Sequence, residues 1–345
     1  MINILITGVG GPLGQAIVKA ARLSAIPCRI IGTDRFALSV GLGWVDKPCV
    51  IPDTSHPEEY LAAIRSLCET EKVQLVLPGS DSELELLSQN AAALREQTGA
   101  IVAASPPEVL RIAMDKWETC QFLERAGLHA PRTVRFDGNG SGAQLVEQLG
   151  FPLIVKPRRG SGSQGLFKVR SEDDLHYIAT LHREMVIQEY LQPDDEEYTV
   201  AVYTQRDGRQ AGSICMKREL VAGNTYRAWV NQNATVQAEA EAIVRALRPR
   251  GPCNVQLRLT ARGPVAFEIN PRFSGTTAMR AHFGYNEVEM ALRDFVLGEP
   301  VPAPVVRPGI ALRFWDETYL DADGRPATAG ASGFASAETA TEVAL

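Results

Sequence analysis

The sequence predicts an α/β domain built on a parallel sheet, followed by a larger α+β region whose strands pair antiparallel. In the first 110 residues, short apolar strands alternate with helical periods of apolar residues, a rhythm typical of βαβ units. Beyond about residue 190, alternating apolar segments flank tight polar turns, which is typical of hairpins. The 345 residues suffice for two or three domains of ordinary size.

The composition narrows the class of protein. A hydrophobic share of 45% and a charged share of 22% indicate a globular chain, and a net charge of −6 argues against a nucleic-acid binder. No apolar run reaches the roughly 18 residues of a membrane span, and the N-terminus lacks a signal-peptide pattern. The six cysteines form no CxxC pair and are expected to be reduced thiols. We therefore expect a cytoplasmic enzyme without a membrane or nucleic-acid partner.

The parallel-sheet domain is expected over residues 1–110. Its strands are predicted at 3–6, 29–32, 49–51 and 73–77, and its helices at 12–23, 57–72 and 84–97. A glycine-rich turn, Gly8 to Gly14, joins the first strand to the first helix. Ligands of such sheets gather at the carboxyl ends of the strands, so the loops after Ile6, Thr33 and Pro78 are candidate contacts.

The central region is predicted to be a compact α+β unit. Helices are expected at 106–114, 115–127, 143–149 and 172–183, and strands at 152–156, 166–169 and 185–190. Strands at 198–205, 210–217, 254–259 and 265–269 follow, with a helix at 237–247. From residue 321 the chain is rich in Ala, Thr, Ser and Gly, which indicates a loosely packed tail.

The last predicted hairpin carries two different faces. Because side chains alternate along a strand, one face is apolar and should point at a core: Val255, Leu257, Leu259, Val265, Phe267 and Ile269. The opposite face carries Gln256, Glu268 and Asn270, whose oxygens suit a hard cation such as Mg²⁺. Arg272 follows directly and would place a positive charge beside a metal-bound anion. The alternative is a polar face that only contacts water.

A second candidate site follows the strand that ends at Lys156. Burying a lysine at a strand end is costly without a partner. The loop 158–165 that follows contains three glycines and two serines, and such a loop can offer successive backbone amides to phosphate. It does not match the P-loop, because no Lys-Ser or Lys-Thr follows the last glycine. A plain hairpin turn is the alternative.

Taken in order, these features resemble the ATP-grasp superfamily, in particular the branch of the carbamoyl-phosphate synthetase large subunit and related carboxylate–amine ligases. The resemblance runs over about residues 1–300 and rests on Lys116, the Lys156 strand, the glycine-serine loop, Gln188–Leu191, Glu197–Val200, and Gln256 with Glu268–Arg272. It implies a Rossmann-like pre-ATP-grasp domain (1–110), a small subdomain with a glycine-rich lid (111–191), a C-terminal subdomain with the magnesium site (192–320) and the tail (321–345).

The resemblance also implies roles for individual residues. Lys116 and Lys156 would contact the phosphates of ATP beneath Ser161, Gly162 and Ser163. Glu189, Tyr190 and Leu191 would line the adenine pocket, largely through backbone groups, and Glu197 would hold the ribose, with Glu196 as the alternative. Gln256, Glu268 and Asn270 would hold Mg²⁺, with Mn²⁺ as a substitute, although many members carry an acidic residue in place of Gln256. Arg272, with Lys156, would stabilise the transferring phosphoryl group.

The implied activity is an ATP-dependent ligase that joins a small-molecule carboxylate to an amine through an acyl phosphate, releasing ADP and phosphate. Lys217 and Arg280 are candidate contacts for the carboxylate, and a homodimer is expected by analogy. Three alternatives stay open: an enzyme that forms carboxy or carbamoyl phosphate, a nucleotide-binding regulator without catalysis, and a nicotinamide-dependent oxidoreductase. The last would use the turn from Gly8 to Gly14 with Asp34, which is close to a dinucleotide fingerprint.

Overall fold

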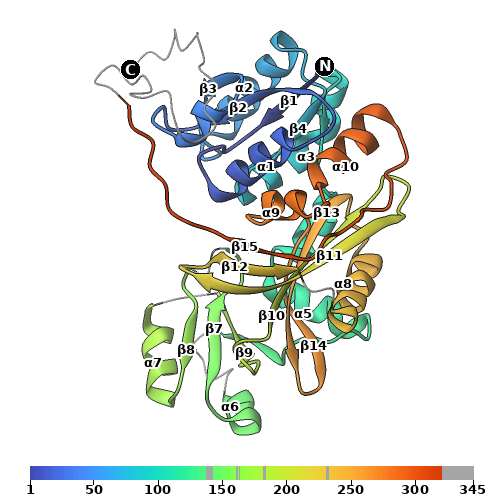
Figure 1. The fold of residues 1–345 in the computed structure, drawn as a ribbon. Helices are drawn as coiled ribbons and strands as arrows, with labels where there is room; N and C mark the ends of the chain where they lie inside the picture. The colour runs from blue at the N-terminus through green and yellow to red at the C-terminus, as the bar shows by residue number, and fades with distance from the viewer. Residues whose placement is uncertain (137–142, 161, 163, 182–183, 231–232, 321–345) are drawn as a thin grey trace.

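The computed structural model describes residues 1–136, 143–160, 162, 164–181, 184–230 and 233–320, and the chain forms three sheets (Figure 1). The predicted tail from residue 321 lies outside the described residues. No helix in the described part of the chain has the length and apolarity to cross a bilayer. The division at residues 110, 191 and 320 stays a prediction, and each sheet is described below by its strands.

The first sheet is parallel, as predicted, with strand order β3-β2-β1-β4-β5. Its strands are β1 (Ile2–Ile6), β2 (Cys28–Asp34), β3 (Lys47–Val50), β4 (Leu75–Leu77) and β5 (Ile101–Val102). Between them lie α1 (Pro12–Arg22), the short η1 (Val40–Trp44), α2 (Pro57–Thr70) and α3 (Asp81–Thr98). Alternation along β1 sends Ile4 and Ile6 into one core, with α1, and Leu5 into another, with α2 and α3. Both faces of the sheet are therefore covered.

Two antiparallel sheets follow. The smaller has the order β6-β9-β7-β8 and carries its own apolar core. It consists of β6 (Thr133–Phe136), β7 (Leu153–Pro157), β8 (Phe167–Val169) and β9 (Met185–Glu189), with α6 (Ala143–Leu149) and α7 (Glu172–Leu181). Before it come α4 (Pro107–Ala113) and α5 (Lys116–Arg125).

The larger antiparallel sheet has the order β14-β13-β10-β11-β12-β15. Its strands are β10 (Glu197–Thr204), β11 (Gln210–Val221), β12 (Asn224–Val230), β13 (Gly251–Thr260), β14 (Gly263–Asn270) and β15 (Gly309–Leu312). The helix α8 (Ala234–Leu247) packs on one face through Val236, Ile243 and Val244. The sequence pattern did not predict β5, β6, β12 and β15, and three of these strands, β5, β6 and β15, have only two to four residues.

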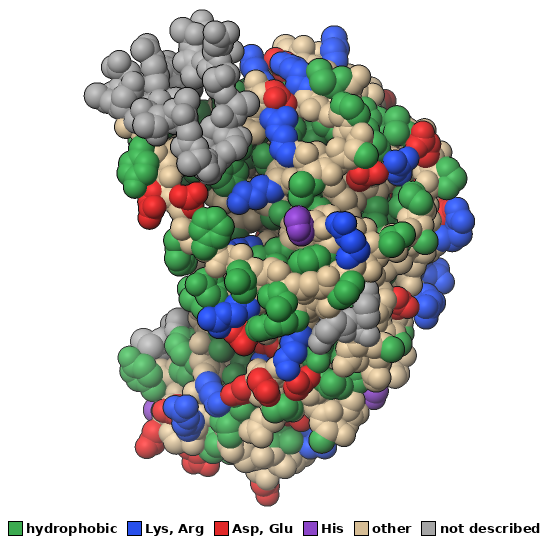
Figure 2. Space-filling view, viewed as in Figure 1, with side chains coloured by type: hydrophobic (Ala, Val, Ile, Leu, Met, Phe, Trp, Pro, Cys, Tyr) green, Lys and Arg blue, Asp and Glu red, His purple; other side chains and the backbone are tan. Residues whose placement is uncertain are grey.

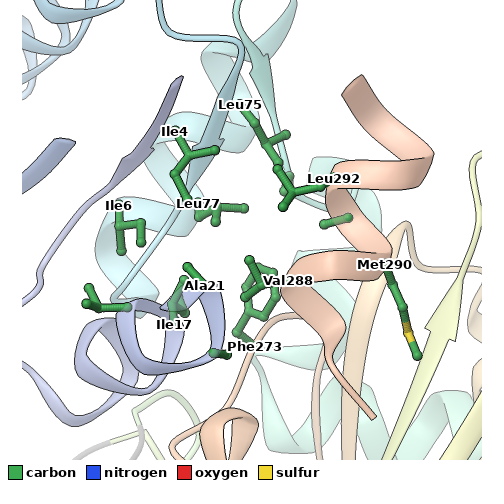
Figure 3. Packing of buried hydrophobic residues seen from close by; sticks show 14 of the residues in the cluster. Ile4, Ile6, Ile17, Ala21, Leu75, Leu77, Phe273, Val288, Met290 and Leu292 are labelled. Carbon is green, nitrogen blue, oxygen red and sulfur yellow. The ribbon is translucent and has the colours of Figure 1, made fainter. Parts of the chain in front are cut away.

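The segment after β14 returns to the first sheet. It forms α9 (Thr277–His282), α10 (Glu287–Ala291) and the π-helical turn η2 (Leu292–Leu297), none of which the sequence pattern predicted. Figure 3 shows Phe273, Val288 and Leu292 from this segment in one cluster with β1 and β4. One apolar core is thus shared by the parallel sheet and by the chain that follows the predicted metal hairpin.

Truncation of this shared core should destabilise the whole protein. Leu292 is 0% exposed, so Leu292→Ala is expected to lower the free energy of unfolding by about 2–5 kcal/mol through lost burial and a cavity. Leu297, on the same turn, is 44% exposed, and Leu297→Ala is the matched control, expected to cost under about 1 kcal/mol. Unfolding midpoints in urea measure both. Equal shifts for the two variants would contradict a shared core.

Candidate active site

A cavity of about 390 Å³ lies between the two antiparallel sheets. Strands β7 and β9 form one wall, and β10, β11, β13 and β14 form the other. On the face in Figure 2, positive and negative side chains are interspersed, and both signs gather over the lower half of the molecule. That face has no extended patch of one sign. The charges that matter for the site line the cavity instead.

Two lysines approach each other in this cavity from different elements. Lys156, in β7, is 6% exposed, and burial lowers its pKa to about 8, although the carboxylate of Glu268 opposes the shift. Its Nζ lies 5.7 Å from the centroid of the Phe267 ring. Lys116, the first residue of α5, donates from Nζ to the carbonyl oxygen of Gly160 at 2.8 Å. Burial also lowers the pKa of Lys116, and Glu268 again acts against the shift.

The lysines are positioned by a pair that sequence reasoning did not single out. Asp115 caps α5, with its Oδ1 accepting from the backbone of Trp117 at 2.9 Å. Its Oδ2 accepts from Arg158 at 2.6 Å, and the backbone N of Lys116 donates to the carbonyl of Arg158 at 2.9 Å. This latch ties the start of α5 to the loop after β7. The N-cap role of Asp115 could have been predicted, because Asp before a helix is an N-cap pattern. The ion pair with Arg158 could not, because no sequence spacing links the two residues.

Glu197 stands between two arginines in the wall of the cavity. Its Oε1 accepts from Arg218 at 2.8 Å, and its Oε2 pairs with Arg258. Glu196 points elsewhere, pairing with Lys217 at 2.6 Å, and does not line the cavity. Of the two candidate ribose ligands, only Glu197 therefore faces the space where a nucleotide would lie.

Glu189, Tyr190 and Leu191 also line the cavity. The Glu189 carboxylate is held by Arg262 at 2.6 Å, while Lys168 lies 3.7 Å from the centroid of the Tyr190 ring. The carbonyl of Leu191 accepts from Arg258 at 2.9 Å. Gly162 lines the same cavity, whereas Ser161 and Ser163 lie outside the described residues.

The predicted polar face of the last hairpin is present, with Gln256 paired directly opposite Glu268. Asn270 donates to Glu268 Oε1 at 2.9 Å, and Gln256 Oε1 accepts from Arg218 at 2.6 Å. Arg272 donates to Asn270 Oδ1 at 3.0 Å. The three candidate ligands thus adjoin one another on β13 and β14.

The predicted apolar face of that hairpin is wrong at two positions, Val265 and Phe267. The register shifts between Gln256 and Leu257, so Leu257 pairs with Ala266 and Phe267 is the extra residue. Ala266 therefore fills the core, and the ring of Phe267 lines the cavity below Lys156. A bulge of one residue cannot be read from strict alternation.

The donor set fits a magnesium ion that is shared with phosphate. Among the described residues, no group of three His, Cys, Asp or Glu side chains could hold a metal alone. Glu268 offers one carboxylate, and Gln256 and Asn270 offer amide oxygens. Mg²⁺ is commonly held by one or two carboxylates together with substrate phosphates and waters. A metal site with one carboxylate and two amide oxygens, in the wall of a cavity that could hold a nucleotide, is consistent with that pattern.

A second cavity of about 210 Å³ adjoins the first. The two share Lys116, Gly160 and Glu268 as lining residues. The second one reaches the first turns of α3, where Asp81 and Glu85 line it. Asp81 pairs with Arg272, and Glu85 pairs with Arg159 from the loop after β7. Neither α3 residue was singled out from the sequence, because no local pattern links them to Glu268.

The two candidate carboxylate contacts line neither cavity. Lys217 is paired with Glu196, as described above. Arg280 is 0% exposed and is held by Glu287 at 3.3 Å, by Thr199 at 3.0 Å and by Asn254. An arginine so enclosed stabilises the packing of α9 against β10 and β13.

The polar groups in and beside the glycine-rich turn form hydrogen bonds within the protein. Gly8, at φ +55°, is so close to the Glu83 carboxylate that an added Cβ would lie 2.7 Å from it. Thr7 donates to that carboxylate at 2.9 Å, and the backbone N of Gly10 donates to Asp34 at 2.7 Å. The groups that a dinucleotide would use are therefore engaged inside the domain. The observation disfavours the oxidoreductase alternative.

A cavity between two antiparallel sheets, lined by two lysines and a polar hairpin, is the arrangement expected of an enzyme of the ATP-grasp type. Residues 113–276 match the family model of the ATP-grasp domain, and residues 4–102 match that of the PylC-like N-terminal domain. The chain therefore carries an ATP-grasp domain behind a PylC-like N-terminal domain, and the resemblance to the ATP-grasp superfamily is confirmed.

Individual proteins with known names are similar over most of the chain. The formate-dependent phosphoribosylglycinamide formyltransferase of Synechococcus sp. (strain RCC307) is 25% identical, over 87% of this chain and 77% of that protein. Carboxyaminoimidazole ribonucleotide synthase from Aspergillus clavatus, solved with ATP, superposes with a TM-score of 0.72 at 19% identity, covering 90% and 81% of the two chains. An L-amino acid ligase from Bacillus licheniformis gives 0.66 at 17% identity, covering 89% and 78%. The two structures establish likeness of fold.

The buried charge of Lys156 should make stability depend on pH in a defined direction. Below about pH 8 both folded and unfolded chains hold the proton, and burial of the charge opposes folding. Between about pH 8 and 10.5 the folded chain releases a proton that the unfolded chain keeps, so that opposition fades. Lys156→Met is therefore expected to raise the free energy of unfolding by roughly 2–3 kcal/mol at pH 7, and by less at pH 9.5.

Urea unfolding at the two pH values measures this difference. Lys168→Met is the control, because Lys168 is 34% exposed, and it should give a small change that is the same at both pH values. A gain for Lys156→Met that does not shrink as the pH rises would contradict the burial argument.

Proposed function

We propose that this protein forms an amide bond between a small carboxylic acid and an amine, with ATP converted to ADP and phosphate. A carboxylate oxygen of the first substrate attacks the γ-phosphorus, and the bond from that phosphorus to the β,γ-bridging oxygen breaks. The amine then attacks the carbonyl carbon of the acyl phosphate, and phosphate leaves with loss of a proton. The first step depends mainly on positioning and on charge neutralisation.

One observation carries this proposal. Lys116 and Glu268 line both cavities, and Lys156 lines the larger, although the three residues belong to α5, β14 and β7. The boundary between the cavities is where a γ-phosphate and an attacking carboxylate would meet. Cations and a metal-binding carboxylate gathered at that boundary are what phosphoryl transfer requires.

The remaining roles follow from where the side chains lie. Lys116 and Lys156 bind the phosphates, Glu197 binds the ribose, and residues 189–191 surround the adenine. Glu268 and Asn270, with Gln256, hold Mg²⁺ or Mn²⁺, which neutralises phosphate charge when bound. Arg272 adjoins Asn270 and stabilises the transferred phosphoryl group. Lys156, desolvated and beside Glu268, adds a positive charge in a place where water screens it little.

The six cysteines are free and two-thirds of them are buried, which supports a reducing, cytoplasmic location. The partners are small molecules. We also propose, by analogy alone, that the protein is a homodimer. The molar mass in solution, measured by gel filtration and by sedimentation equilibrium, tests this proposal.

The proposal is tested by measuring phosphate release from ATP while carboxylic acids are crossed with amines and ammonia. Glu268→Gln is expected to lower turnover about 10²–10³-fold, because a neutral amide cannot balance the charge of a bound metal. The folded state should persist, since Glu268 is not in a buried core. Glu219→Gln, on the neighbouring exposed part of β11, is the control and should keep full turnover. Phosphate release by Glu268→Gln at the normal rate would refute the metal assignment.

A further inference from the structure

The side chain of Gln188 faces the larger cavity directly before the three residues that surround the adenine. Along β9, Met185 and Ile187 point into the core of the small sheet, so Gln188 points to the opposite face. Gln188 pairs with Ile154 on β7, which also lines the cavity and lies two residues before Lys156. Because Lys156 marks the phosphate end of the cavity, the row of Ile154 and Gln188 lies toward the base of the nucleotide.

The nitrogen end of the Gln188 amide is engaged within the protein. Its Nε2 donates to the Thr133 hydroxyl at 3.0 Å and to the Cys120 sulfur at 3.2 Å. The hydroxyl of Thr133 gives its single proton to the carbonyl oxygen of Pro131 at 2.8 Å or to the same sulfur at 3.2 Å. In both cases it meets Gln188 with a lone pair. Both amide hydrogens are thus used, and the neighbouring side chains determine which way the amide is turned.

The oxygen end of the same amide has no partner in the described part of the chain. Gln188 is 2% exposed, and no described residue donates to its Oε1. A buried carbonyl oxygen without a hydrogen bond is costly, and such groups are rare in folded proteins. The cavity is the side on which this oxygen can find a donor. The amide therefore points to a ligand that presents an N–H group at this place.

Purine bases differ in what they present to such an oxygen. Adenine carries an amino group at position 6, which donates, whereas guanine and hypoxanthine carry a carbonyl oxygen there, which only accepts. Two acceptors that face each other leave both without a hydrogen bond. An amide that rotates freely can offer its nitrogen to one base and its oxygen to another. An amide held in one orientation selects adenine.

We propose that Gln188 determines the nucleotide specificity of this site, with its Oε1 accepting from the 6-amino group of adenine. Thr133 and Cys120 are positioning residues that keep this oxygen turned toward the cavity. The inference rests on the proposed function, because that function places the adenine beside residues 189–191. Backbone contacts to a base are the same whatever side chains are present. This contact depends instead on three side chains from α5, β6 and β9.

The first test compares ATP with purine riboside triphosphate, which carries hydrogen in place of the 6-amino group. Calorimetry measures the binding of each to the full chain with Mg²⁺, without acid or amine. The parent is expected to bind ATP about tenfold more tightly or better. Gln188→Leu removes the acceptor and should reduce this ratio about fivefold, by weakening the binding of ATP alone. Gln164→Leu, at an exposed position that lines the same cavity, is the control and should keep the ratio.

Thr133→Val tests whether the orientation of the amide matters. Valine keeps the shape of threonine but cannot accept from Gln188, so the amide can turn its nitrogen toward the cavity and donate to a 6-oxo group. The preference for ATP over inosine triphosphate is expected to fall about fivefold, in part because inosine triphosphate binds more tightly. Thr133→Ser restores the hydroxyl and should keep the preference. A purely structural role of Thr133 would weaken both nucleotides equally.

Three outcomes would overturn the inference and leave the ligase proposal standing. They are a parent that binds ATP and purine riboside triphosphate equally, a ratio that Gln188→Leu leaves within twofold of the parent, and equal weakening of both nucleotides in Thr133→Val. Urea unfolding shows whether each variant is folded, and Gln188→Met replaces Gln188→Leu if the latter is not. Failure of the parent to bind any of these nucleotides would instead refute the proposed function itself.

Discussion

The arrangement of the site depends on the apolar core that the parallel sheet shares with the chain after β14. Ile4, Ile6, Leu75 and Leu77 on one side pack with Phe273, Val288 and Leu292 on the other. Each buried side chain of this size contributes about 1.5–3 kcal/mol. The link begins one residue after Arg272, so the β13–β14 hairpin and the first turn of α3 are fixed relative to one another. That is why Asp81 meets Arg272 across nearly two hundred residues of sequence. The small sheet, by contrast, has a core of its own and contributes its lysine from a separately packed unit.

In this fixed arrangement, the charged groups of the site form ion pairs and hydrogen bonds with one another. Glu197 is held by two arginines, Lys116 by the carbonyl of Gly160, and Arg272 by Asp81 and Asn270. Such pairing offsets the cost of burying charge and fixes the side chains in place before a ligand arrives. Gln256 fits the same logic. Its amide accepts from Arg218 while remaining neutral, so the arginine stays paired with Glu197 rather than being drawn onto an acidic metal ligand.

The sequence predicted those parts of the site that depend on local pattern. Alternation along β13 and β14 placed Gln256 and Glu268 on one face, and an apolar strand ending in a lysine marked Lys156. The sequence pattern did not predict features that depend on strand register or on contacts between residues far apart in the chain. The bulge turns Phe267 from the core into the cavity, and α9, which carries the buried Arg280, has only six residues and no strong period. Asp81 and Glu85 lie on a helix whose exposed acidic residues resemble any solvated face. This face of α3 borders the site because of the shared apolar core, which no local sequence pattern predicts.

The two cavities divide the chemistry between different parts of the chain. The larger of the two cavities is built from elements within the ATP-grasp match, over residues 113–276, whereas the acidic wall of the second cavity comes from α3, within the N-terminal match over residues 4–102. Phosphoryl transfer makes the same demands whatever acid is activated, namely cations and a metal at the border. Recognition of the acid makes different demands for each substrate, and the second cavity borders α3, which lies outside the ATP-grasp match. The apolar core shared by β1, β4 and the chain after β14 keeps the parallel sheet, and α3 with it, at a fixed position relative to the hairpin that carries Glu268.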